Sequence, residues 1–197
     1  MVYDFDVTPD WHQLCLYNGQ STRDQLRVSV PLCGSRADGA IGLDANAEYY
    51  VYDFWNDAFA GRLKGSDTLR QELRGGEARV LSIRKVLTEP QVVSTNRHLM
   101  QGYLDLEDVR WNPAKRQFRG KARVVAGDPF QIVLATNGLR VKLVTSSRKG
   151  AVLGTSPHKD GAGLVVLTIK TPASEAVKST ELKPTDWCVS FEIGSEP

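Results

Sequence analysis

Residues 44–65 read DANAEYYVYDFWNDAFAGRLKG, and this stretch decides the fold class. Successive side chains of a β-strand point to opposite faces of the sheet. One face of this stretch would carry Tyr50, Tyr52 and Phe54, and the other Tyr49, Val51, Asp53 and Trp55. The alternation predicts a strand that runs into an aromatic corner and indicates a β protein.

Similar strand-like runs recur along the whole chain, and Gly, Pro, Asn and Asp separate them. The expected strands are Trp11–Tyr17, Gln25–Pro31, Glu48–Phe54, Ala78–Leu87, His98–Leu106, Phe118–Val125, Phe130–Ala135, Leu139–Thr145, Leu164–Lys170 and Trp187–Ile193. Helical periodicity is weak, and its best candidate, Ser66–Leu73, fits a strand equally well. We therefore predict an all-β protein built as an antiparallel β-sandwich.

Two finer features are expected within this fold. Asn137-Gly138 predicts a hairpin that pairs Phe130–Ala135 with Leu139–Thr145. The length of 197 residues allows one large sandwich or two small ones, and we favour two consecutive sandwich subdomains. Trp111-Asn112-Pro113 breaks the strand pattern, so we place the boundary between residues 1–108 and residues 109–197.

Composition and charge narrow the classes of partner. Hydrophobic residues make up 41% and charged residues 24% of the chain, which is typical of a globular protein. The net charge is +2, and the basic residues Arg119, Lys121 and Arg123 share one predicted strand face that we interpret as solvated. We expect no nucleic-acid partner, because that function calls for a broader basic surface with interspersed aromatic residues.

The cysteine pattern predicts no metal site, and the sequence predicts no membrane-spanning or targeting segment. Cys15, Cys33 and Cys188 cannot all pair, and no CxxC spacing predicts a zinc site, so we expect buried free thiols and no metal or other cofactor. No apolar run predicts a membrane partner, and no leader follows Met1. The expected location is cytoplasmic if the chain is complete, and export stays open if it belongs to a longer precursor.

Catalytic residues are harder to find. A glycosidase needs two carboxyl groups that face each other across a cleft. The tempting pairs, Asp53 with Asp57 and Asp105 with Glu107, are neighbours in sequence and do not fit that requirement. The three histidines share no spacing from which a zinc site or a triad can be built. We therefore predict no catalytic residue, although the chain's status as an enzyme stays open.

Three residues are the best candidates for contact with carbohydrate or a partner: Trp55, Arg97 and His98. The aromatic residues near Trp55 are expected to fill the core, and Trp55 is the expected exception because it lies where the strand ends. Arg97 and His98 end the polar run Ser94-Thr95-Asn96-Arg97-His98, just before a predicted strand whose Leu99, Tyr103 and Leu104 should pack. This run either satisfies buried backbone groups or meets a partner surface.

Several of these segments resemble one protein family. Tyr49–Trp55, Leu16-Tyr17-Asn18, the run Ser94–His98 and Gln101-Gly102 look like the β-domain that follows the catalytic barrel in α-galactosidase (melibiase)-like glycoside hydrolases. The resemblance extends from Trp11 to about Asp108 and thins afterwards. It implies a non-catalytic C-terminal accessory domain, since nothing in the chain resembles the family's (β/α)8 barrel, which carries the catalytic carboxylates.

Two functions follow as hypotheses. In the first, the chain buttresses a catalytic barrel, present in cis or as a separate chain, and contacts sugar. In the second, it is an independent carbohydrate-binding or protein-interaction module. A long apolar patch would favour the first. An aromatic-lined groove that binds sugar would favour the second.

Overall fold

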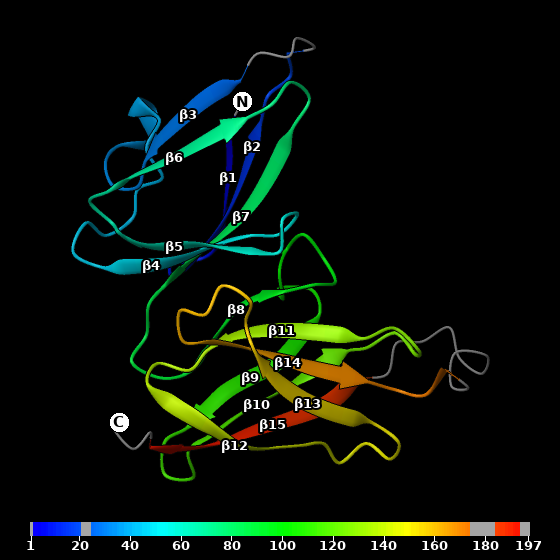
Figure 1. The fold of residues 1–197 in the computed structure, drawn as a ribbon. Coiled ribbons are helices and arrows are strands. Elements are labelled where there is room, and N and C mark those ends of the chain that lie inside the picture. The colour runs from blue at the N-terminus through cyan, green and yellow to red at the C-terminus, as the bar shows by residue number, and fades with distance from the viewer. Residues whose placement is uncertain (1, 21–24, 174–183, 194–197) are drawn as a thin grey trace. The chain divides into compact units, whose positions relative to one another are not determined.

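The computed structural model describes residues 2–20, 25–173 and 184–193 (Figure 1). The protein is all-β, with a short 3-10 turn at Arg36–Asp38. The strands are β1 Val2–Thr8, β2 Trp11–Tyr17, β3 Leu26–Pro31, β4 Glu48–Asp53, β5 Ala58–Lys64, β6 Thr68–Leu73, β7 Ala78–Lys85, β8 Gln91–Thr95, β9 Leu106–Asn112, β10 Gln117–Arg123, β11 Phe130–Ala135, β12 Leu139–Thr145, β13 Val152–Pro157, β14 Leu164–Lys170 and β15 Pro184–Ile193.

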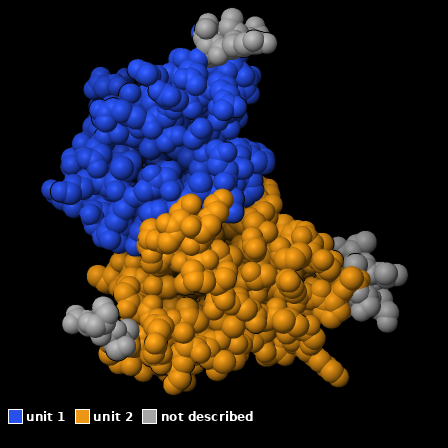
Figure 2. Space-filling model, viewed as in Figure 1, with its two compact units in different colours: residues 1–86 blue, residues 87–197 orange. Residues whose placement is uncertain are grey.

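The chain divides into two compact units, unit 1 (Met1–Val86) and unit 2 (Leu87–Pro197) (Figure 2). The division falls earlier than the boundary expected after Asp108, which lies inside β9. The charged residues there do not mark a linker. Glu107 and Asp108 pair with the basic residues Arg123 and Lys121 across the β9–β10 ladder, which also explains the solvated basic face of β10.

In unit 1 a five-stranded antiparallel sheet, ordered β1-β2-β7-β4-β5, faces the two-stranded ribbon β3-β6 (Figure 1). Alternate residues of both layers form the core, among them Leu14 of β2, Val51 of β4, Leu69 of β6 and Ile83 of β7. The segment with the ambiguous helical signal is strand β6. Its Leu69 and Leu73 are buried while Arg70 and Glu72 are exposed, which is the period of two of a strand.

Unit 2 is a sandwich of two four-stranded sheets, β12-β15-β10-β9 and β13-β14-β11-β8. The two sheets lie one over the other in Figure 1. The core between them holds Trp187, which is 1% exposed, with Phe118 edge-on at a centroid distance of 5.4 Å. Phe130 and Leu167 fill the core from the opposite sheet. This arrangement accounts for the inward alternation of the strands in the second half of the chain.

The predicted hairpin between β11 and β12 is wrong. β11 pairs with β14 and β8, whereas β12 pairs with β15 in the other sheet. Asn137 and Gly138 do form a turn with positive φ of 49° and 84°. The Asn137 side chain, however, donates to the carbonyl oxygens of Leu87 and Glu89, at 3.0 and 2.5 Å. The turn is thereby held at the sandwich corner, where the chain crosses between sheets.

The aromatic strand is core, as predicted. Tyr49, Tyr50 and Tyr52 are 2%, 6% and 1% exposed. Phe54, beyond the end of β4, is only half-buried.

The three cysteine thiols are free, as predicted, but they are half-buried rather than buried. Burial raises the pKa of the Cys188 thiol. No helix among the described residues has the length and apolar character to cross a membrane.

Candidate functional site

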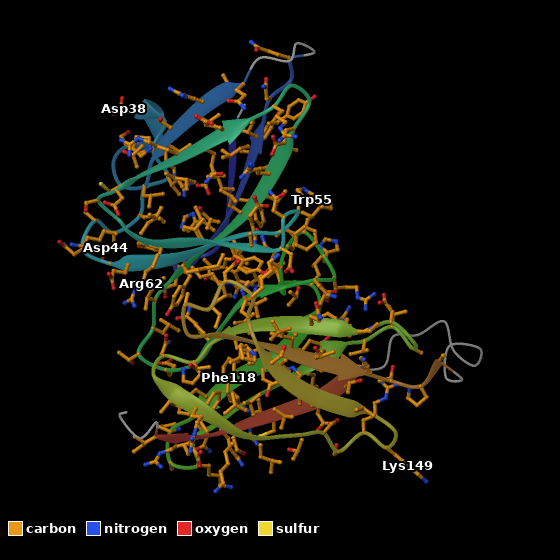
Figure 3. The ribbon with its side chains drawn as sticks, viewed as in Figure 1. Asp38, Asp44, Trp55, Arg62, Phe118 and Lys149 are labelled. Atoms are coloured by element: carbon orange, nitrogen blue, oxygen red, sulfur yellow. The ribbon has the colours of Figure 1, made fainter. Side chains whose placement is uncertain are left out.

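Trp55 lies in the turn between β4 and β5 and is 60% exposed (Figure 3). The Phe54 ring meets it nearly edge-on, at a centroid distance of 5.0 Å. Asp53, 2% exposed, accepts hydrogen bonds from the backbone nitrogen and from Nδ2 of Asn56, at 3.3 and 2.7 Å. Burial makes these bonds hard to replace with water. The exposed indole is therefore carried on a turn of defined conformation.

Asn56, the next residue, lines a polar groove of about 600 Å³ that lies wholly within unit 1. The groove is formed by the β4–β5 turn, the end of β6 and the start of β7. The residues that line it contribute polar side chains or, at the glycines, backbone groups. They are Gln25, Asn56, Glu72, Arg74, Gly75, Gly76, Glu77 and Arg79. Trp55 itself does not line the groove, but it precedes the lining residue Asn56 in the same turn.

Arg79 ties the wall of the groove to the Trp55 turn. Its guanidinium donates to Gln71 at 2.9 Å and to Glu77 at 3.0 Å, and lies 3.4 Å from Asp53 Oδ2. The backbone N–H of Arg74 lowers the pKa of Glu77, and Arg79 adds to this effect. Glu77 is therefore ionised at neutral pH, and the groove wall carries fixed charges of both signs.

Asn18 anchors the glycine turn of the groove. It is 0% exposed, and its Nδ2 donates to the Leu73 carbonyl at 3.2 Å. Its backbone carbonyl accepts from Gly76 at 2.8 Å, where φ is 77°, a conformation that favours glycine. Nothing in the sequence assigns Asn18 a role in a site. Its burial just after β2 is the signal, and only the fold reveals it.

Three of the four tempting carboxylates have a structural partner, and the fourth, Asp105, has a buried Oδ2 that accepts no hydrogen bond from the described residues. Asp53 binds Asn56, and Asp57 accepts from the Tyr52 hydroxyl at 2.6 Å. Glu107 pairs with Arg123. Asp105 is 9% exposed, and burial raises the pKa of its carboxyl group. These positions fit the interpretation of the four residues as structural groups.

Arg97 and His98 lie in unit 2, whereas Trp55 lies in unit 1, so neither unit contains all three candidates. Arg97 forms an ion pair with Asp128, and its guanidinium stands 5.8 Å from the centre of the Phe130 ring. His98 is half-buried, and its Nδ1 accepts from the backbone nitrogen of Met100 at 3.2 Å. Both side chains thus fold back on their own unit.

The segment after them differs from the prediction. Residues 99–105 form turns instead of a strand, because Gln101 and Gly102 have positive φ of 50° and 113°. Leu99, Tyr103 and Leu104, which were expected to pack, are 43%, 51% and 48% exposed. The polar run is also split. Ser94 and Thr95 are buried in β8, and the run meets solvent only from residue 96 onward.

We expect Arg97→Ala to destabilise unit 2 by about 1–2 kcal/mol. The substitution removes an ion pair, which contributes little when exposed, and the packing of the guanidinium on Phe130. Chemical denaturation measures the change. Arg119→Ala on the exposed face of β10 is the control and should cost less than about 0.5 kcal/mol. Equal midpoints for the two variants would show that Arg97 is not a structural support.

No protein-family model and no curated protein matched the chain in our comparisons.

Proposed function

We propose that the chain is a non-catalytic accessory β module of an α-galactosidase-like glycoside hydrolase, and that unit 1 contacts carbohydrate. The observation that carries the sugar contact is the exposed Trp55 on a fixed turn whose next residue, Asn56, lines the groove. Pyranose rings have apolar faces that stack on aromatic rings and hydroxyl groups that bind amides and charged side chains. Trp55 supplies the first feature, and the groove the second.

The charges of the groove favour a neutral sugar. Glu72 and Glu77 balance Arg74 and Arg79, so the lining has no net charge. Arg79 is already engaged by Glu77 and Gln71 and is not positioned to clamp a ligand carboxylate. A neutral galactoside is therefore a better ligand than a uronate of the same ring geometry.

The barrel-docking role rests on the family resemblance and on unit 2. Leu99, Tyr103 and Leu104 expose apolar surface on one short segment, next to the Arg97–Asp128 pair. An interface within a multidomain chain is typically apolar in part and polar in part. We propose that this segment faces the catalytic barrel. An independent protein-interaction module would use the same surface, so this observation leaves that alternative open.

Binding to methyl α-galactoside tests the sugar contact. We expect saturable binding of the full chain by titration calorimetry. Trp55→Ala should weaken it about tenfold or more, since stacking of that strength corresponds to about 1.4 kcal/mol. Galacturonate should bind more weakly than the galactoside. Trp55→Phe, which keeps a ring, should retain most of the affinity. Equal affinity in the alanine variant would remove the observation on which the proposal rests.

The non-catalytic role has its own assay. Purified chain should not turn over aryl α-galactosides. Turnover that disappears in Asp53→Asn or Asp105→Asn would overturn the accessory role and would leave the sugar contact as a separate question.

A further inference from the structure

The edge hairpin of unit 1 brings three potential metal ligands together. β1 and β2 are antiparallel, with Asp6 opposite His12 and Asp4 opposite Leu14. Asp4 and Asp6 are two residues apart and share a face, which is also the face of His12. Asp4, Asp6 and His12 form no recognised metal-ligand motif in the sequence. The hairpin register creates the cluster.

The geometry of the cluster suits one small cation. His12 Nδ1 lies 3.3 Å from Asp4 Oδ1 and 2.9 Å from Asp6 Oδ1, and one ligand atom from each residue falls within 4.8 Å of the others. Two ligands at 2.0–2.1 Å from a tetrahedral zinc ion stand roughly 3.3–3.4 Å apart. The separation of His12 from Asp4 already has this value. His12 is 5% exposed and is therefore held in place.

The balance of charges in the cluster also favours a bound cation. Arg36 Nη2 contacts both oxygens of Asp6, at 2.5 and 2.7 Å, and lies 3.4 Å from Asp4 Oδ2. One guanidinium thus faces two carboxylates. Asp4 Oδ2 is buried and accepts no hydrogen bond from the described residues. The Arg36 side chain is 55% exposed, and its Nε donates to the Ile41 carbonyl at 3.1 Å, so its Nη2 end must turn away from Asp6 when another cation arrives.

We propose that Asp4, Asp6 and His12 form a binding site for a divalent cation of the zinc class. An imidazole nitrogen and two carboxylate oxygens are ligands that zinc accepts, and water completes the coordination. Nδ1 of His12 faces both carboxylates, so it is the ring nitrogen that is placed to coordinate the metal. On binding, Arg36, the resident counter-charge, moves off Asp6.

Titration of untagged, EDTA-treated full chain with ZnCl2 tests this proposal, with visible absorption of Co²⁺ as a second readout. We expect one ion per chain and an intense Co²⁺ spectrum of low coordination number. His12→Gln should weaken binding at least tenfold. Arg36→Gln should tighten it, because the competing cation is gone. His158→Gln is the matched control, since His158 lies 3.7 Å from Asp160 in unit 2, and it should bind like wild type.

Three results would overturn the proposal. The first is the absence of saturable Zn²⁺ binding by the wild-type chain. The second is equal affinity in wild type and His12→Gln. If His12→Gln does not fold, Asp4→Asn and Arg36→Gln replace it with opposite expected signs. The third is weaker or unchanged binding in Arg36→Gln, which would contradict the competition between Arg36 and the metal for Asp6.

Discussion

Replacing Trp187 by alanine is expected to destabilise unit 2 by about 3–5 kcal/mol, the usual cost of removing a large buried ring. Trp187 is 1% exposed and lies between the two sheets. Its indole packs edge-on against the ring of Phe118 (Figure 3). The sheets are too regular to collapse onto the space that an indole leaves, so most of the cavity should persist. A loss of this size approaches the total stability of many domains.

Hydrogen exchange measures the effect and locates it. Protection should fall across β10 and β15, which carry Phe118 and Trp187. Trp55→Ala makes the same chemical change at a 60% exposed position and should alter the free energy of unfolding by less than about 0.5 kcal/mol. If the two tryptophan variants lost equal stability, the assignment of Trp187 to the core and of Trp55 to the surface would be wrong.

Gly65→Ala is expected to cost about 3 kcal/mol in unit 1. A Cβ atom at residue 65 would stand 1.9 Å from the carbonyl oxygen of Asp44. The obstacle is backbone rather than a flexible side chain, so the 44–47 turn must move. Its hydrogen bond from Gly65 N to the Ala47 carbonyl, 2.7 Å long, would be strained as well. Overpacking of this kind typically costs 1–3 kcal/mol and sometimes more.

The control for this prediction is Gly154→Ala. Gly154 lies in the exposed strand β13, and a Cβ there would meet nothing within 4 Å. The melting temperature of this variant should match that of the wild type or exceed it slightly, since alanine restricts the unfolded chain. Comparable melting temperatures for the two variants would contradict the close approach of the Asp44 and Gly65 backbones.

The local alternation of side chains is enough to predict the all-β class and the burial of Tyr49 to Tyr52, because the period of two of a strand is visible in its own sequence. It also singled out Trp55 at the end of that strand. The partners of a strand are not local information. Asn137-Gly138 has the turn conformation that its residues favour, yet β11 and β12 enter different sheets. Asn137 is fixed by Leu87 and Glu89, about fifty residues away in the chain.

The same limit applies to the candidate sites. The groove joins Asn56 to Arg74 and Arg79, and the cation site joins Asp6 to His12, through registers that only the folded sheet defines. Arg97 was identified as a contact residue because polar residues cluster around it. Its partner Asp128, contributed by a distant turn, ties the side chain to its own unit, and the sequence alone does not show this pairing.

The most direct test of the proposed function is to locate bound sugar on the protein. Backbone NMR spectra of the full chain, titrated with methyl α-galactoside, would show which residues respond. We predict saturable shifts confined to the Trp55 turn and the groove, at residues 55–56 and 74–79, and their loss in Trp55→Ala. Absence of saturable shifts at millimolar sugar, or shifts that map only to unit 2, would contradict the proposal that unit 1 contacts carbohydrate.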